Sequence, residues 1–449
     1  MRSVFTLVIT LLSASWLYAQ DGWKASTART VITPKESMWL AGYGGRDKPS
    51  EGKMHDLWAK ALALQDAQGN KALFITTDVL GFNKQIADNV RKQLQAKHGI
   101  SPAQVILSSS HTHSGPVLSN ALVDIYPLNE TEQAKIERYT AFFEQQIIKI
   151  SDEALRALKP AKVFTGSGIA RFQVNRRTNV EAQITDVFEL KGPNDHSVPV
   201  IKVLNADNSP MAILFGYACH PTVLSGYEWS GDYPGFTQIE LEKRYPTATA
   251  MYFQGAAGDQ NPLPRRTRQI AEQYGLDLAN AVTRVVEEPM KPLAPRLVTA
   301  YGEVDLKLLP GPSVQELEKT ISSQSGYLKR WAERMLAENK AGKKYMTSYP
   351  YPVQVWMLGD QPIVSLGGEV TIEYTLKIKQ MFGNNVFVAA YTNDVMAYIP
   401  SLKVWREGGY EGETSQMVYG LPSKWEPSIE SEILLKVYEL GKKAGFPVK

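Results

Sequence analysis

Two histidines, His111 and His113, stand close together in a short polar segment, residues 108–116. The segment follows residues 104–107, an apolar run rich in β-branched residues that predicts a buried strand. In extended backbone, residues two apart point to the same side, so the two imidazoles can face one cavity. This arrangement suits a metal site or a metal ligand beside an acid/base, although a single His-x-His is equally compatible with surface polarity.

More polar groups come directly after other predicted strands: His220, residues 255–261, Glu369, Asn393 and Tyr398. In open α/β sheets the ligand crevice lies at the carboxyl ends of the strands. We therefore expect the polar groups that follow these strands to meet in that crevice. Two histidines and a carboxylate, with one position left for water, form the ligand set of catalytic zinc. Each histidine then needs an outer acceptor for its second nitrogen, which Asp78, Asp232 or Asp259 can supply.

The elements that must position these groups alternate between strands and helices. Strands are predicted near residues 23–34, 55–64, 71–79, 104–107, 198–204, 211–218, 248–254, 298–309, 362–366 and 386–391. Helices are predicted at residues 83–98, 129–158, 266–288, 313–340, 370–381 and 426–445, and a loop at 402–424. This order predicts an α/β fold, a mixed sheet flanked by helices with the metal site at the carboxyl ends of the strands.

Composition narrows the class of protein. The chain has 449 residues, 43% of them hydrophobic, which is enough for a large core. A net charge of +3 does not favour nucleic acid or a membrane surface as partner. The single cysteine, Cys219, excludes an internal disulfide and is typical of a small buried side chain. No segment reaches the roughly 20 apolar residues of a transmembrane helix.

The first 20 residues have the layout of a secretory signal peptide. Arg2 supplies the positive charge, residues 4–12 are apolar, and Ala19 is a small residue before the predicted cleavage point. Turn-prone Asp21-Gly22 follows, which favours this interpretation over a buried strand. We therefore expect export to the periplasm or the extracellular space.

The ordered motifs resemble those of the neutral (non-lysosomal) ceramidases. The resemblance rests on residues 110–116, 219–222, 258–259, 368–371 and 393–398, with similar stretches at 32–34, 41–43 and 175–176. It runs from about residue 25 to 425, so residues 21–449 are expected to form a single ceramidase-like domain. Family members usually carry a further C-terminal β-sandwich domain, and the resemblance here is to the N-terminal catalytic domain only.

The resemblance implies roles for individual residues. His111, His220, Glu369 and Tyr398 would ligate one zinc ion, and His113 would face the substrate carbonyl as acid/base. Arg176 would donate a hydrogen bond near the scissile group. The family hydrolyses the amide of N-acyl sphingosine, by a mechanism in which zinc lowers the pKa of its water towards about 7 and the hydroxide attacks the carbonyl. His113 or Arg176 would stabilise the oxyanion, and His113 would pass a proton to the leaving amine.

One departure bears on the substrate. The family's loop normally carries a serine after Gly-Asp, whereas here Gly258-Asp259 is followed by Gln260 and Asn261. Either Asn261 or Gln260 is expected to take over its hydrogen bond. Alternatives therefore stay open: the same zinc site acting on a glycan-linked ester or amide, or a non-enzymatic exported zinc-binding protein. Loop aromatics suit an acyl chain or a sugar face equally: Trp39, Trp229, Tyr233 and Trp405.

Overall fold

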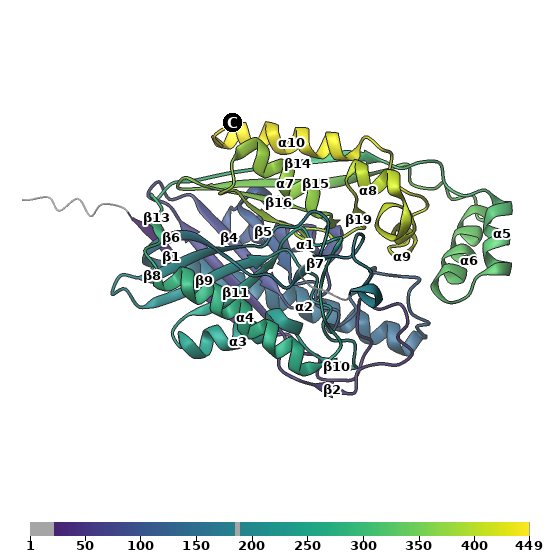
Figure 1. The fold of residues 1–449 in the computed structure, drawn as a ribbon, viewed down its shortest axis with the longest axis horizontal. Helices are drawn as coiled ribbons and strands as arrows, with labels where there is room; N and C mark the ends of the chain where they lie inside the picture. Colours follow the sequence, from purple (N-terminus) through teal and green to yellow (C-terminus); the bar gives the residue numbers. More distant parts are fainter. Residues whose placement is uncertain (1–21, 185–188, 449) are drawn as a thin grey trace, which may run out of the picture.

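Two β-sheets pack face to face between two layers of helices (Figure 1). The structure, a computed structural model, describes residues 22–184 and 189–448. The predicted signal peptide, residues 1–20, lies outside the described residues. Within the two described ranges no helix is both long and apolar enough to cross a membrane. The division into a signal peptide and one domain stays a prediction.

The larger sheet is mixed, as predicted. Its strand order is β11 (Thr249–Gln254), β9 (Pro210–Tyr217), β8 (Ser197–Asn205), β6 (Lys159–Ile169), β1 (Trp23–Val31), β3 (Trp58–Gln65), β4 (Lys71–Thr77) and β5 (Val105–Ser109), with β13 (Lys291–Pro292) added to β6. The pairs β4–β5 and β9–β11 are parallel, and the other pairs are antiparallel. The mixed α/β class predicted from the sequence is confirmed.

The second sheet and three short strand pairs complete the β-structure. The second sheet has the order β14 (Leu297–Lys307), β15 (Ser348–Leu358), β16 (Gln361–Leu366) and β18 (Phe387–Ala389). The short pairs are β2 (Gly52–Lys53) with β10 (Glu228–Trp229), β7 (Gln173–Asn175) with β12 (Gln260–Pro262), and β17 (Glu369–Val370) with β19 (Tyr398–Ile399). The last two pairs carry or adjoin predicted site residues.

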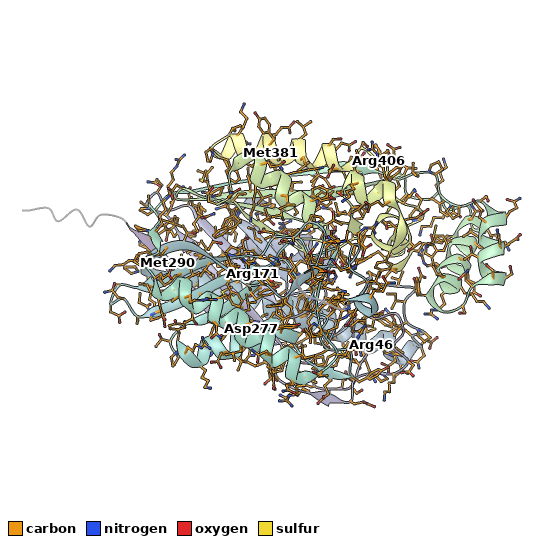
Figure 2. All side chains as sticks on the ribbon, viewed as in Figure 1. Arg46, Arg171, Asp277, Met290, Met381 and Arg406 are labelled. Atoms are coloured by element: carbon orange, nitrogen blue, oxygen red, sulfur yellow. The ribbon has the colours of Figure 1, made fainter. Side chains whose placement is uncertain are left out.

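The alternation of apolar side chains along each strand produces the layers. In β9, Ile213 and Phe215 pack towards the helices, whereas Ala212 and Leu214 pack towards the second sheet. The helices over the larger sheet are α1 (Lys84–His98), α2 (Glu130–Arg156), α3 (Asp232–Arg244) and α4 (Arg268–Glu287). Those over the second sheet are α7 (Ile372–Phe382) and α10 (Ile429–Ala444), and side chains fill the spaces between the layers (Figure 2).

Local signals explain why α1 begins and ends where it does. The Asn83 side chain accepts a hydrogen bond from the backbone N–H of Ile86, which caps the first turn. Gly99 ends the helix in the left-handed conformation, at φ 67°. Ile86, Val90 and Leu94 form the buried face. The predicted helix over residues 83–98 is confirmed.

Two predictions about the C-terminal half are wrong. The single helix predicted over residues 313–340 is two helices, α5 (Val314–Ser323) and α6 (Gly326–Lys340), because Gly326 turns the chain at φ 62°. The predicted loop 402–424 contains α8 (Leu402–Glu407), a π-helix (Tyr410–Thr414) and α9 (Ser415–Val418).

Strand β15 and helix α3 were not predicted at all. Pro350 and Pro352 lower the strand propensity of β15, which nevertheless pairs with β14 and β16. Pro234 and Gly235 do the same for the helix propensity of α3, although both lie in its first turn, where proline is tolerated.

Phe74 tests the packing between the two sheets. Its ring, 2% exposed, lies 5.9 Å from the ring of Phe253 in the larger sheet and 6.0 Å from that of Trp356 in the second. We expect Phe74→Ala to lower the free energy of unfolding by about 3–5 kcal/mol in denaturant titrations. The control is Phe142→Ala on α2, where the ring is only partly buried. Equal losses of unfolding free energy in both variants would contradict the packing of Phe74 between the two sheets.

Candidate metal centre

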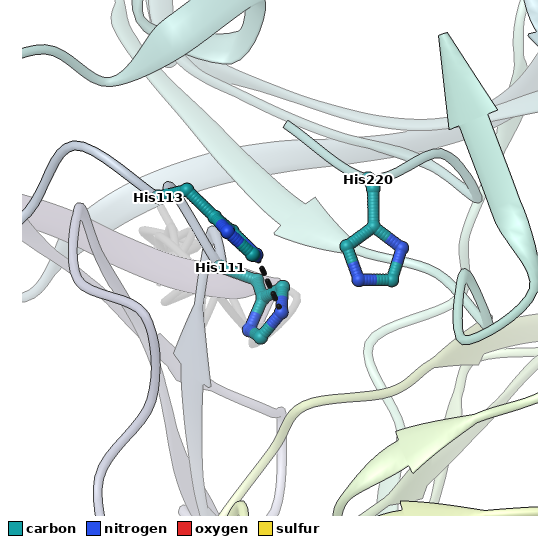
Figure 3. Close-up of side chains that lie close together, drawn as sticks. All are labelled: His111, His113 and His220. Carbon is teal, nitrogen blue, oxygen red and sulfur yellow. Dashed lines mark hydrogen bonds between the residues drawn. The ribbon is translucent and has the colours of Figure 1, made fainter. Parts of the chain in front are cut away.

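Three histidines meet beyond the ends of strands β5 and β9. His111 lies two residues after β5, His220 lies three residues after β9, and His113 projects towards both (Figure 3). The Nε2 atoms of His111 and His113 are 3.3 Å apart. One ring nitrogen from each of the three histidines lies within 4.8 Å of the others, which is close enough for a shared metal ion. His111 and His220 are buried.

His111 and His113 face each other as predicted, but not because the backbone between them is extended. His111 is not extended: its φ is 62°, in the left-handed region. Its backbone N–H donates to the Val79 carbonyl, and that of Ser110 donates to the Thr77 carbonyl. The turn that brings the imidazoles together is thus held by the neighbouring strand rather than by pleated alternation.

Backbone carbonyls set the tautomers of the two buried histidines. The Nδ1 atom of His111 lies 2.6 Å from the Leu80 carbonyl oxygen, and that of His220 lies 2.5 Å from the Ala257 carbonyl oxygen. Because a carbonyl only accepts, each Nδ1 carries the proton and each Nε2 presents a lone pair to the centre. This is the orientation a metal ligand requires.

The prediction that Asp78, Asp232 or Asp259 fills this outer role is wrong, since carbonyls fill it. The three carboxylates accept from other groups: Asp78 from Trp58 and Gln238, Asp232 from Val223, Leu224 and Tyr233, and Asp259 from Asn175 and Ile372. They hold the loops that bear the histidines rather than the histidines themselves.

Glu369 faces the two lone pairs. Its Oε2 lies 3.0 Å from Nε2 of His220 and 3.3 Å from Nε2 of His111, while the Tyr419 hydroxyl donates to Oε1 at 2.5 Å. Burial opposes ionisation of Glu369, but a positive charge shared with His111 and His220 outweighs it and holds the pKa of Glu369 well below its ordinary value. A carboxylate oxygen and two nitrogen lone pairs in mutual contact repel one another unless a metal ion or a proton lies between them.

The donor set fits zinc. Donors held about 2.0–2.1 Å from a tetrahedral zinc ion lie about 3.3 Å from one another, close to the separations seen here. The pKa of His220 is lowered to about 4, chiefly by burial, so its ring is neutral and free to bind at neutral pH. The structure thus brings the predicted ligands His111, His220 and Glu369 together.

His113 and Tyr398 are the two candidates for a fourth ligand beside His111, His220 and Glu369. Burial, with His111 and His220, holds the pKa of His113 well below its ordinary value, so this imidazole is also neutral. Its Nδ1 is buried and has no hydrogen-bond partner among the described residues. Tyr398 is in parallel register with Glu369 through the β17–β19 pair, which places it beside the centre. The assignment of Tyr398 as ligand and His113 as acid/base stays a prediction.

Arg176 joins the predicted groups Asn261 and Tyr398 in one cluster. Its Nη2 donates to the Tyr398 hydroxyl at 3.1 Å, its Nη1 to Asn261 at 3.3 Å, and its Nε to Glu411 at 2.7 Å. Burial opposes the charge on Arg176, but Tyr398 and Glu411 outweigh it and hold its pKa above the ordinary value. The antiparallel β7–β12 pair explains the contact, because Arg176 directly follows β7 and so lies beside β12, which carries Asn261.

Other expectations about site residues fail or shift. Gln260 points away from Arg176 and donates to the Pro193 carbonyl. Asn393 is structural: it accepts from the backbone N–H of Leu107 and donates to Gln354. Among the loop aromatics, three belong to the core instead: Trp39, Trp229 and Tyr233.

Two functional neighbours were missed. Glu411 and Tyr419 lie in the segment predicted as a loop, and neither has a spacing signal that links it to Arg176 or Glu369. The only hint was the richness of residues 402–424 in glutamate and tyrosine.

Comparison with solved structures identifies the fold. The structure is similar to that in the crystal structure analysis of neutral ceramidase from Pseudomonas aeruginosa, with a TM-score of 0.73 and 17% identity over 95% of this chain and 75% of that chain. A complex described as ceramidase with C2 matches equally, at a TM-score of 0.73. The chain thus has the α/β fold seen in a neutral ceramidase.

Sequence comparison identifies the family. The family model described as neutral/alkaline non-lysosomal ceramidase, N-terminal, matches residues 28–263, more than half of the chain, and the chain belongs to this family. Neutral ceramidase B of Dictyostelium discoideum is 27% identical over 216 residues, 46% of this chain and 29% of that protein. Neutral ceramidase of Pseudomonas aeruginosa is 23% identical over 279 residues, 58% of this chain and 41% of that protein. The aligned part is thus under half of each relative's length.

A substitution at Gly42 tests whether the His113 ring packs against the backbone of this residue. Gly42 has φ 104°, and a Cβ added there would lie 2.5 Å from the imidazole of His113. We expect Gly42→Ala to displace the ring and to change the ¹⁵N NMR signals of the His113 side chain. Gly45→Ala is the matched control, since nothing lies within 4 Å of its added Cβ. Unchanged imidazole signals in Gly42→Ala would contradict the close packing.

The depressed pKa of His220 predicts a pH dependence of stability. Between pH 6.5 and about 4 the unfolded chain binds a proton at His220 and the folded chain does not. The free energy of unfolding of metal-free protein should therefore fall as pH falls through this window, by up to about 3 kcal/mol from this residue. His220→Gln removes this contribution, so its unfolding free energy should fall less over the same window. Parallel pH profiles for the two proteins would count against the buried neutral imidazole.

Proposed function

We propose that this protein is an exported, zinc-dependent hydrolase that cleaves the amide (N-acyl) bond of a lipid of the N-acyl sphingosine class. The observation that carries the proposal is the contact of Glu369 with the Nε2 lone pairs of His111 and His220, beside the guanidinium of Arg176. Family membership supports the reaction class. The residues 1–20, with their signal-peptide layout, support export.

In this proposal His111, His220, Glu369 and Tyr398 hold one zinc ion. Zinc at this position supplies a Lewis acid and lowers the pKa of water towards about 7. Tyr419 orients Glu369 through its hydrogen bond to Oε1, which leaves Oε2 directed at the two imidazoles.

Arg176 stabilises the negative charge that develops on the substrate carbonyl oxygen. Its guanidinium is held by Glu411 and Asn261 and donates to Tyr398, so it needs little reorganisation when substrate binds. Loss of one such donor typically lowers the rate by about 10²–10³. Tyr398, which accepts from Arg176, lies between this donor and the metal ligands.

His113 moves the proton. Because the pKa of His113 lies well below its ordinary value, the neutral ring accepts a proton from the attacking water readily only as negative charge builds up nearby. It then passes that proton to the nitrogen of the leaving amine. Its Nδ1, which is buried without a partner among the described residues, leaves one side of the ring uncommitted.

A second substrate class is favoured by one observation. Asn261 stands beside Arg176 where the family's loop normally carries a serine. The amide presents an acceptor oxygen and a donor nitrogen as separate atoms, whereas a serine hydroxyl uses one oxygen for both roles, and the second polar atom suits a glycan-linked ester or amide with its several hydroxyls. This alternative keeps the same metal ligands and changes only the bond that is cleaved.

The direct test is fatty-acid release from N-acyl sphingosine by the purified protein. We expect release from the protein as isolated, loss after chelation, and recovery on addition of zinc. Absence of release from protein with one bound zinc ion would overturn the sphingolipid substrate and direct the assay to glycan-linked esters and amides. Failure to bind zinc at all would overturn the metal site.

Variants separate the roles of the histidines. His220→Ala should lose both zinc, measured by metal analysis, and activity, because it removes a ligand. His113→Ala should retain zinc and lose turnover by about 10²-fold or more, because it removes only the proton carrier. His196→Ala, which lies outside the three-histidine group, is the control and should match the unmodified protein. Loss of zinc from His113→Ala would mean that His113, and not Tyr398, is the fourth zinc ligand.

A further inference from the structure

His113 is held differently from the other two histidines of the centre (Figure 3). The Nδ1 atoms of His111 and His220 each face a backbone carbonyl, which fixes the orientation of those two rings. The ring of His113 lacks such a contact: its Nδ1 has no hydrogen-bond partner among the described residues, and its Nε2 faces Nε2 of His111. The position of this imidazole therefore depends on its backbone and on the groups that pack against it.

Arg46 fixes the backbone of His113. Its Nη2 donates to the carbonyl oxygen of His113 at 2.8 Å, and its Nη1 donates to the carbonyl oxygen of Gly226 at 2.8 Å. Gly226 lies in the segment that follows His220. One planar guanidinium thus joins the segment that bears His113 to the segment that bears His220.

Arg46 also holds the aromatic ring that packs on the imidazole. The guanidinium lies 5.4 Å from the centre of the Tyr43 ring, and the Tyr43 ring lies 4.7 Å from the imidazole of His113. The Tyr43 hydroxyl donates to the Leu224 carbonyl at 2.8 Å, so the far end of the ring is tied to the same segment after His220. The backbone N–H of Arg46 donates to the Tyr43 carbonyl and closes the turn between them.

The charge of Arg46 is not neutralised by a carboxylate. Arg46 is 5% exposed, and none of the described carboxylates forms an ion pair with it. The neighbouring Asp47 accepts from the Tyr227 hydroxyl instead, and the Tyr227 ring lies 5.1 Å from the guanidinium. Burial of a charge without a counter-charge costs free energy, so a contribution to stability does not by itself account for an arginine here.

We propose that Arg46 is a positioning residue for His113. Its guanidinium joins the two histidine-bearing segments and clamps the Tyr43 ring against the imidazole. A lysine is a poor substitute, because an ammonium lacks the planar fork that reaches two carbonyls at once. Only the consequence for turnover rests on the proposed function, in which His113 carries the proton.

The first test is ¹⁵N NMR of the histidine side chains in the full chain as isolated, at one fixed pH. The chain has six histidines, so the spectrum has few signals, and His113→Ala identifies those of His113. Arg46→Met removes both donors and keeps the length of the side chain. We expect it to shift or broaden the His113 signals more than those of His111 or His220. Unchanged His113 signals, or equal changes for all three histidines, would overturn the proposal.

Arg91→Met is the matched control for this measurement. Arg91 is also 5% exposed, donates to the Val105 carbonyl and lies 4.9 Å from the Tyr301 ring, so its loss perturbs a buried site of the same kind. It should leave the His113 signals in place. The same change in Arg91→Met as in Arg46→Met would show a general effect of a lost buried arginine and contradict the proposal.

The second test separates kcat from KM in fatty-acid release. We expect Arg46→Met to lower kcat by about tenfold or more, because displacement of a proton carrier is costly in the transition state. KM and the zinc content should match those of the unmodified protein, since the proposed zinc ligands are intact. Arg46→Lys keeps the charge and should restore kcat only in part. Loss of zinc in parallel with kcat, or full recovery in Arg46→Lys, would count against the positioning role.

A second pair of variants keeps the proposal testable if Arg46→Met fails to fold. Tyr227 is partly exposed, and Tyr227→Leu removes the aromatic face that its ring presents to Arg46. This variant should again shift mainly the His113 signals, by a smaller amount. Tyr227→Phe loses only the hydroxyl that donates to Asp47 and should leave them in place. No shift in Tyr227→Leu, or an equal shift in Tyr227→Phe, would overturn the proposal.

The NMR measurements involve no hydrolysis. Their failure therefore leaves the proposed function untouched, and absence of fatty-acid release leaves the contact of Arg46 with His113 untouched.

Discussion

The contact of one buried carboxylate with two imidazole lone pairs is the constraint on which the centre depends. Glu369 is almost fully buried, and burial of a charge is costly unless partners compensate for it. The Tyr419 hydroxyl compensates one oxygen, whereas the other oxygen faces the two nitrogens and needs a positive charge shared with them. The lone pairs in turn face inward only because carbonyl oxygens hold the opposite side of each ring. Removal of any of these partners leaves a buried group unsatisfied.

Asp259 ties together the segments that carry this arrangement. Its carboxylate accepts from Asn175, next to Arg176, and from the backbone N–H of Ile372, just after β17. Its own carbonyl accepts from the backbone N–H of Arg176. The same loop binds His220 through the carbonyls of Ala257 and Gln260. Burial raises the pKa of Asp259, in keeping with a carboxyl whose work is positional.

Short-range patterns in the sequence predicted the elements well where they were regular. The periodicity and caps of α1 and the apolar runs before His111 and His220 gave the correct elements at the correct places. Prolines lowered the strand propensity of β15, so this strand was not predicted, and a glycine separates α5 from α6. Single residues of these types override a pattern that is averaged over many residues.

The site was predicted only in part, for a related reason. His111, His220 and Glu369 each follow a strand, so their positions were visible in sequence. Glu411 and Tyr419 reach the centre from a π-helix and a short helix, and Leu80 and Ala257 act through carbonyls that any residue possesses. No residue type or spacing records such contacts, which depend on the tertiary arrangement alone.

The division of the centre between two sheets has a consequence for how the protein is made. His111 and His220 follow strands of the larger sheet, whereas Glu369 follows β16 of the second, 149 residues beyond His220. During synthesis the histidines leave the ribosome long before the carboxylate that completes their site. Contacts so distant in sequence form late in folding, because loop closure must come first. Capture of the proposed metal ion by the full donor set would therefore belong to the end of folding and would report that both sheets have docked.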